Sequence, residues 1–240
     1  MRMNKNAPNK RRDLIISISC ILVIAISLSL TGIFLFQSLY YDPFWVSGQS
    51  MYPTLNKEAK YTDGTLVGER HSPIFEEGEY DVDYGFMATS KKAINKIKRF
   101  DIVVFEAGNE LVSYNIKRII ALPGETFYIV SSSDATNGSL YIKNGDSFDL
   151  VNQPLSSELV SAGLYPSTYT TPTTLGENEY FVMGDNRIRD NSYDSRLSGP
   201  VKKESILGVA KGLNGKATLG TNKKGTYTAV KVKHYWPRFF

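Results

Sequence analysis

The sequence predicts a mainly β protein that follows a single N-terminal transmembrane helix. Two observations lead to this prediction. An uncharged apolar run covers residues 14–36, and the rest of the chain consists largely of short runs rich in β-branched and aromatic residues, separated by glycine, proline and serine. Regular helix patterns are scarce after the apolar run, which favours a β-rich outer domain over a helical one.

The apolar run has the length of a membrane-spanning helix. A helix of its 23 residues, at about 1.5 Å per residue, is longer than the roughly 30 Å thickness of a bilayer's hydrocarbon core. A cleaved signal peptide would have a shorter apolar region, so an anchor is favoured. Five Lys or Arg residues precede the run and the next one is Lys57, so the positive-inside rule predicts a cytoplasmic N-terminus and an extracellular C-terminal part.

Charge and cysteine content exclude several functions. The net charge is +4, but the first twelve residues carry five positive charges and no negative one. The outer domain is therefore near neutral, with no basic surface for nucleic acid, whereas the tail can contact the lipid bilayer. The only cysteine, Cys20, lies in the apolar run, which excludes a disulfide or a thiol nucleophile outside it. We expect no metal and no cofactor.

Seven short apolar runs predict the strands of the outer domain. Turn signals, Pro123-Gly124 and Asn144-Gly145, follow two of them and favour hairpin-like connections. The predicted strands cover residues 100–105, 114–120, 127–130, 140–143, 180–183, 206–210 and 227–232.

Three segments have a less certain pattern. Residues 91–99 are interpreted as a solvated approach to the next strand rather than as a short helix. The aromatic residues between 37 and 45 suit either the lipid–water interface or a substrate contact. For the terminal residues 235–240, closure of the core is favoured over contact with lipid.

A serine and a lysine are the candidate catalytic pair. Ser50 lies in a segment marked by glycine and proline, where a turn can present its hydroxyl to a substrate. A serine becomes a nucleophile only when a base takes its proton, and neither His71 nor His234 has the flanking features of such a base. Lys117 lies in an apolar run, where burial would lower its pKa and favour the neutral amine that can act as a base. The alternative is a lysine that only extends from an edge strand to solvent.

These residues and their neighbours resemble the bacterial type I signal peptidases, especially the Gram-positive members. A pilus-associated streptococcal member is a narrower alternative within the same resemblance. Each matching segment alone is a modest signal, and four of them in order behind a membrane anchor are a strong one. The segments are Ser50-Met51-x-Pro53-Thr54, Asp101-Ile102-Val103-Val104, Lys117-Arg118 with Pro123-Gly124, and Gly184-Asp185-Asn186-Arg187 with Asn191-Ser192-x-Asp194-Ser195-Arg196.

The resemblance implies a membrane-anchored serine endopeptidase with a Ser/Lys dyad, which removes N-terminal signal peptides from secreted preproteins. Ser50 would be the nucleophile and its backbone N–H an oxyanion donor, and Lys117 would be the general base. Ser192 would orient the lysine amine. Met51 would line the pocket for the small residue before the scissile bond, unless it is a plain core methionine. Three residues would support the loop that carries Ser192: Asp185, Asp194 and Arg196.

The hydropathy and composition along the chain indicate an organisation in five parts. They are a cytoplasmic tail (1–13), a transmembrane helix (14–36), the first part of the catalytic domain (37–130), a β insertion (131–178) and the second part of the catalytic domain (179–240). The alternative function is a non-cleaving assembly factor for pilus polymerisation, with pilin or sortase machinery as its partner.

The sequence departs from the family's pattern at three places. Phe100 stands where the family usually has glycine, and Gly48 stands where some relatives have a hydroxyl near the oxyanion. Three residues, 188–190, separate Arg187 from Asn191 where the common spacing has one. The longer loop is expected to affect how Ser192 meets Lys117.

Overall fold

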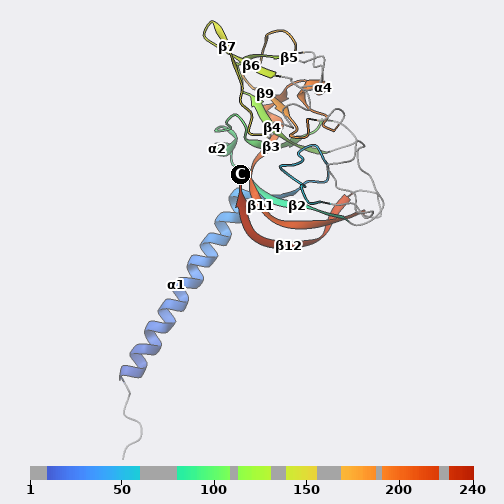
Figure 1. Cartoon of the computed structure of the whole chain (residues 1–240). Coiled ribbons are helices and arrows are strands. Elements are labelled where there is room, and N and C mark those ends of the chain that lie inside the picture. The colour runs from blue at the N-terminus through green and yellow to red at the C-terminus, as the bar shows by residue number, and fades with distance from the viewer. Residues whose placement is uncertain are drawn as a thin grey trace, which may run out of the picture. The chain divides into compact units, whose positions relative to one another are not determined.

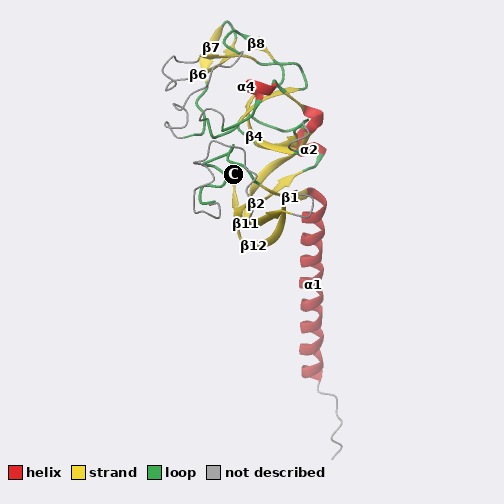
Figure 2. Cartoon of the chain, turned by 90° about the vertical axis from the view of Figure 1, so that its right-hand side faces the viewer, coloured by secondary structure: helices red, strands yellow, loops and turns green. Residues whose placement is uncertain are grey.

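The computed structural model describes residues 10–59, 80–108, 113–130, 139–155, 169–187, 191–221 and 227–240. The chain divides into two units, Met1–Tyr41 and Asp42–Phe240. The first contains a helix and the second contains two β-sheets (Figures 1 and 2). The prediction of a mainly β protein behind one N-terminal apolar helix is therefore confirmed.

Helix α1 (Lys10–Tyr40) contains the whole apolar run. Among the described residues it is the one helix long and apolar enough to cross a membrane. Its hydroxyl groups bond within the helix: Ser29 Oγ donates to the carbonyl of Ala25 and Thr31 Oγ1 to that of Ser27, both at 2.9 Å. These bonds make polar side chains tolerable in lipid, so the helix fits a membrane-anchored protein.

The larger sheet contains Lys117, the predicted general base. Its eight strands run in the order β1-β2-β11-β3-β4-β9-β10, with β12 paired to β11. Neighbouring strands pair antiparallel where their register is defined. The strands are β1 (Tyr41–Trp45), β2 (Tyr80–Ala88), β3 (Ile102–Glu106), β4 (Tyr114–Ala121), β9 (Glu179–Met183), β10 (Val201–Lys202), β11 (Ile206–Thr221) and β12 (Tyr227–Phe239).

The smaller sheet lies at the end of the domain away from β11 and β12 (Figures 1 and 2). Its order is β7-β6-β5-β8. The β6–β7 connection is the hairpin that Asn144-Gly145 predicts, with Gly145 at φ +59°. β5 precedes residue 131 yet pairs with β6 in this sheet, and the boundary of the insertion stays a prediction. The strands are β5 (Thr126–Val130), β6 (Ser139–Asn144), β7 (Ser147–Leu150) and β8 (Thr173–Thr174).

Buried side chains on both faces of β3 explain its unbroken apolar run. Ile102 and Val104 belong to a core cluster with the segment after β1, whereas Val103 and Phe105 belong to another cluster with β9 and β10. A strand covered on both faces needs apolar residues at successive positions rather than at alternate ones. A third cluster joins the smaller sheet to the ends of β4 and β9.

Two internal segments differ from their expected structure. Residues 91–94 form a short helix, α2 (Lys91–Ile94), because the Ser90 hydroxyl accepts a hydrogen bond from the N–H of Ala93 and caps it. Phe44 is buried in the core beside Met51, since β1 is part of the larger sheet.

Two further short helices are α4 (Ser195–Ser198) and the 3₁₀ helix η2 (Lys203–Ser205).

The C-terminal aromatic residues do not close the core as expected. Trp236 is 89% exposed and Phe239 73% exposed, whereas Tyr235 packs against the core cluster that contains Met51. Successive side chains of a strand point to opposite faces, so an edge strand such as β12 can bury Tyr235 only while exposing its neighbour. The alternative, contact of these residues with lipid, stays a prediction.

Candidate active site

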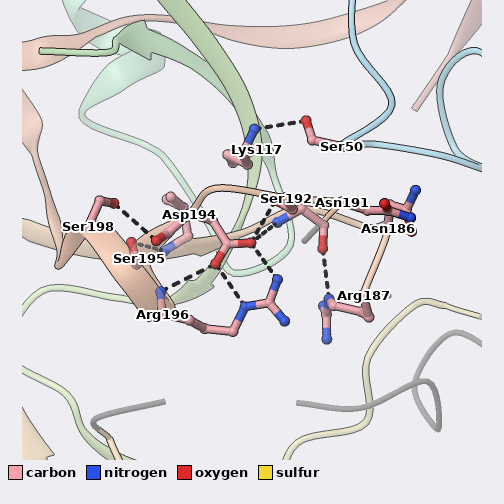
Figure 3. A network of polar contacts seen from close by, with 12 residues as sticks. Ser50, Lys117, Asn186, Arg187, Asn191, Ser192, Asp194, Ser195, Arg196 and Ser198 are labelled. Atoms are coloured by element: carbon pink, nitrogen blue, oxygen red, sulfur yellow. Dashed lines mark hydrogen bonds and ion pairs between the residues drawn. The ribbon is translucent and has the colours of Figure 1, made fainter. Parts of the chain in front are cut away.

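The fold brings the predicted serine and lysine into contact. Lys117 Nζ lies 2.8 Å from Ser50 Oγ and donates to the carbonyl of Ile116 at 3.0 Å (Figure 3). Lys117 is held on β4 between its neighbours β3 and β9, opposite Val103. Ser50 lies in the turn that follows β1. The two residues are 67 positions apart, so only the tertiary structure makes them a pair.

Burial lowers the pKa of Lys117 to about 8. The residue is 3% exposed, and the loss of hydration is the largest cause because it disfavours the charged amine. The carboxylates of Asp194 and Asp185 raise the pKa and the Arg196 guanidinium lowers it. The result is an amine that can lose its proton near neutral pH. The alternative of an edge-strand lysine reaching solvent is wrong, since β4 is an interior strand.

Asn56 fixes the segment that carries Ser50, and sequence reasoning missed it. Its side-chain NH₂ donates to the carbonyls of Val46 at 2.5 Å and Gly48 at 3.1 Å. Asn56 and Asp83 also exchange two hydrogen bonds, at 2.6 and 2.8 Å, which tie the segment to β2. Lys216 pairs with the Asp83 carboxylate at 2.7 Å. Asn56 has a φ of +61°, a conformation that asparagine tolerates better than most residues.

Asp194 organises the loop that contains Ser192. Its carboxylate accepts hydrogen bonds from Ser192 Oγ at 2.7 Å, the Gly184 N–H at 2.9 Å and the Arg196 guanidinium at 2.7 and 2.8 Å (Figure 3). Burial raises the pKa of Asp194, but the Arg196 charge and these hydrogen bonds outweigh it and keep that pKa below its usual value. Asp194 is therefore ionised at neutral pH and holds the loop in one conformation.

A second buried ion pair joins this loop to β4. Arg118 donates two hydrogen bonds to the Asp185 carboxylate, at 2.7 and 2.5 Å. Thr54, four residues after Ser50, donates to the same carboxylate at 2.5 Å. Because Arg118 follows Lys117, the pair connects the three segments that carry Ser50, Lys117 and Ser192. The side chains of Arg118 and Asp185 are 10% and 0% exposed.

Gly184 lies where no side chain fits. A Cβ built on it would come within 2.3 Å of Ser192 Oγ and within 2.4 Å of the Ser50 carbonyl oxygen. The N–H of Asn186 donates to the same Ser50 carbonyl at 3.0 Å. The glycine thus lets the segments that carry Ser50 and Ser192 approach more closely than any other residue would allow.

The other predicted site residues have mixed positions. Met51 is fully buried in the core cluster with Phe44, as expected of a core methionine, and its role in a substrate pocket stays a prediction. Ser192 donates to Asp194, and no hydrogen bond joins it to Lys117 among the described residues. His71 and residues 188–190 lie outside the described part of the chain.

This geometry defines a class of protein. A β-rich domain behind an apolar helix, with a buried lysine amine against a serine hydroxyl, has the elements of a Ser/Lys hydrolase. His234, the one histidine in the described part of the chain, makes no hydrogen bond to either residue.

Comparisons with known proteins define the class further. Residues 14–213 match the family described as signal peptidase, peptidase S26. The chain is 35% identical to signal peptidase I V of Bacillus subtilis (strain 168) over 64% of its length and 85% of that protein. It is 31% identical to a signal peptidase I of Bacillus licheniformis over 86% of its length and 91% of that protein.

A solved structure is also similar. A signal peptidase I from Enterococcus faecalis V583 has 34% sequence identity and a TM-score of 0.33, covering 48% of this chain and 96% of that one. From the family match and the Bacillus relatives, the chain belongs to the signal peptidase family, peptidase S26, as a type I signal peptidase of the Gram-positive kind. It is a peptidase that removes signal peptides, and the comparisons do not favour the non-cleaving alternative.

Proposed function

We propose that Ser50 is the nucleophile and Lys117 the general base of this signal peptidase. The observation that carries the proposal is the 2.8 Å separation between Lys117 Nζ and Ser50 Oγ, together with a lysine pKa of about 8. A neutral amine at this distance can take the hydroxyl proton as Oγ attacks a peptide carbonyl carbon. The C–N bond then breaks, the lysine proton passes to the leaving amine, and the acyl group remains on Oγ as an ester.

Water completes the reaction: Lys117 accepts a proton as the water oxygen attacks the ester carbon, the C–Oγ bond breaks, and the proton returns to Ser50 Oγ as the new carboxyl end is released. In both steps negative charge develops on the former carbonyl oxygen. The Ser50 N–H has no hydrogen-bond acceptor among the described residues, which supports its role as the oxyanion donor. Gly48 adds no side-chain hydroxyl to this donor.

The remaining roles concern the support of the dyad. Asp194 and Arg196 would hold the Ser192 loop through their ion pair, and Asp185 would hold it to β4 through Arg118. Ser192 would orient the lysine: its hydroxyl proton is directed to Asp194, so its lone pairs remain for the amine. Met51 would line the pocket for the small residue before the cut.

The substrates would be secreted preproteins, cut after their signal peptides have entered the bilayer. We place the N-terminus in the cytoplasm, one membrane span at residues 14–36 and the catalytic domain outside the cell. Five Lys or Arg residues before the apolar run support this orientation. In the proposed organisation, the catalytic parts 37–130 and 179–240 flank a β insertion at 131–178. The basic tail would contact anionic lipid head groups.

Cleavage of a preprotein in lipid vesicles tests the dyad. The intact chain is compared with Ser50→Ala, Lys117→Ala and Lys117→Arg, each checked for folding by its thermal midpoint. We expect cleavage by the intact chain and loss of at least about 10³-fold in every variant, since arginine is not deprotonated in a protein. An active Lys117→Arg enzyme would exclude lysine as the base, and an active Ser50→Ala enzyme would exclude Ser50 as the nucleophile.

A further inference from the structure

A buried cation lies beside the loop that carries Ser192, and among the described residues it has no carboxylate partner of its own. Arg187 is fully buried. Its Nε donates to the carbonyl of Gly184 at 2.7 Å, and one terminal nitrogen donates to the side-chain oxygen of Gln153. The nearby carboxylates of Asp185 and Asp194 form their ion pairs with other arginines. Among the described residues, two neutral oxygens are thus the acceptors of this guanidinium.

These two acceptors belong to different parts of the domain. Gln153 follows β7, and its segment is tied to the smaller sheet because the N–H of Val151 donates to the carbonyl of Leu140 on β6 at 2.9 Å. Gly184 begins the loop that carries Ser192, directly after β9. Arg187 therefore links the smaller sheet to the glycine that touches Ser50 and Ser192. A buried guanidinium that lost one acceptor would have to move or bring in water, because an unpaired buried charge is very unfavourable.

We propose that Gln153 is a positioning residue of the catalytic site: its side-chain oxygen holds Arg187, which holds the Gly184 carbonyl and keeps that glycine against Ser50 and Ser192. The proposal rests on the proposed roles of Ser50 and Lys117. Loss of the amide oxygen would let the Gly184 carbonyl rotate and shift the Ser192–Asp194 segment relative to Lys117. Displacement of catalytic groups by even about 1 Å can lower turnover by roughly a hundredfold.

The test compares Gln153→Met with Gln153→Glu in the full chain. Methionine keeps the length of the side chain but removes the acceptor, whereas glutamate keeps an acceptor oxygen. Asn152→Met is the matched control, because Asn152 is the exposed neighbour. We expect kcat to fall between about tenfold and a hundredfold in Gln153→Met with KM little changed, and to stay within about threefold of the parent in Gln153→Glu and Asn152→Met.

Two further measurements separate positioning from a general effect on folding. Amide hydrogen exchange in residues 181–187 should be faster in Gln153→Met and unchanged in Asn152→Met, at equal thermal midpoints. The double variant Gln153→Met with Arg187→Met should have the same kcat as Arg187→Met alone. Each single change already breaks the same link between Gln153, Arg187 and Gly184, so the second change has nothing further to remove. Unchanged kcat and exchange in Gln153→Met, or additive losses in the double variant, would overturn the proposal. Ser50→Ala is assayed in parallel, and its activity tests the proposed dyad independently of Gln153.

Discussion

At the scale of single residues, the proposed chemistry depends on the charge of one buried lysine. Lys117 must be neutral to accept a proton, and its pKa of about 8 lies more than two units below the ordinary value of 10.5. Above this pKa most of the enzyme carries the active base, and below it the active fraction decreases. The activity is therefore expected to rise with pH and to level off above this pKa.

The pH dependence of kcat/KM tests this assignment. We expect one acidic limb with an apparent pKa near 8, and a decrease of about tenfold for each pH unit below it. The measurement uses a peptide substrate whose own groups do not titrate between pH 6 and 10. Activity that is flat from pH 6 to 9 would show that a different group accepts the serine proton.

Gly48 offers a second prediction at this scale. A Cβ built on Gly48 meets no atom within 4 Å, and its φ lies outside the positive range, so larger residues fit there. We expect Gly48→Ser to raise kcat by up to about tenfold, because a hydroxyl would add a second donor for the oxyanion. Gly48→Ala adds the carbon without the donor and should leave kcat unchanged. Equal kcat values for these two variants would count against the idea.

Phe100 carries local backbone strain. Its φ is +73°, in the region that disfavours residues with a Cβ, and this is the position where the family usually has glycine. The strain persists because the Phe100 N–H donates to the Ile119 carbonyl at 2.8 Å and its own carbonyl accepts from Arg118 at 2.8 Å. The residue before β3 is thus fixed by the two strand residues that follow Lys117.

Glycine at position 100 should relieve this strain. We expect the free energy of unfolding of Phe100→Gly to exceed that of Phe100→Ala by about 1 kcal/mol, since alanine keeps the unfavourable Cβ while both variants lack the ring. Denaturant unfolding of the full chain in detergent, followed by tryptophan fluorescence, measures the difference. An alanine variant as stable as the glycine variant would show that the backbone at this position is unstrained.

At the scale of elements, the turn after β1 is held in place differently from the strands. The turn has no regular hydrogen-bond ladder of its own, so Asn56 and Asp83 supply the bonds that hold it to β2. The proposed nucleophile, Ser50, is therefore positioned with the help of a strand that the sequence analysis did not recognise. The polar residues Asp81 and Asp83 obscured its alternating pattern, although Asp83 is buried by its bonds to Asn56 and Lys216.

Asn56→Gly tests the importance of this connection. Glycine adopts the positive φ freely, so the change isolates the side-chain hydrogen bonds. We expect the free energy of unfolding to fall by about 2–3 kcal/mol and kcat by at least about tenfold, because buried donors and acceptors lose their partners and the turn loosens. Asn178→Gly, at an exposed asparagine, is the control. An Asn56→Gly enzyme with the parent's stability and kcat would contradict this role.

At the scale of the whole molecule, orientation in the membrane is the property to test. The chain has one cysteine, Cys20, within α1, so a Cys20→Ser background allows single cysteines elsewhere. Arg11 and Lys143 are both exposed, one at the start of the helix and the other on β6. In intact cells, a membrane-impermeant maleimide should label Lys143→Cys and leave Arg11→Cys unlabelled until the membrane is disrupted. The opposite pattern would reverse the proposed topology.

The sequence by itself determined the class of fold and led to the proposed dyad. The apolar helix and the strands β3, β4, β5, β9 and β11 follow from local patterns, because burial of one or both faces dictates apolar spacing along the chain. A lysine in an apolar run is unusual, whereas a serine in a turn is common, so Ser50 could be selected only together with Lys117 and the other matching segments. Segments with short or mixed patterns, such as β1 and α2, gave no comparable signal.

Only the tertiary structure decided how these residues meet. The 2.8 Å contact of Lys117 with Ser50, the connection of Asn56 to Asp83 and the link from Gln153 through Arg187 to Gly184 all join residues distant in sequence. Their positions depend on strand register and on the packing of two sheets, which no local pattern contains. The exposure of Trp236 depends likewise on β12 being an edge strand. Local periodicity determines which faces are buried, and long-range pairing determines which buried groups become neighbours.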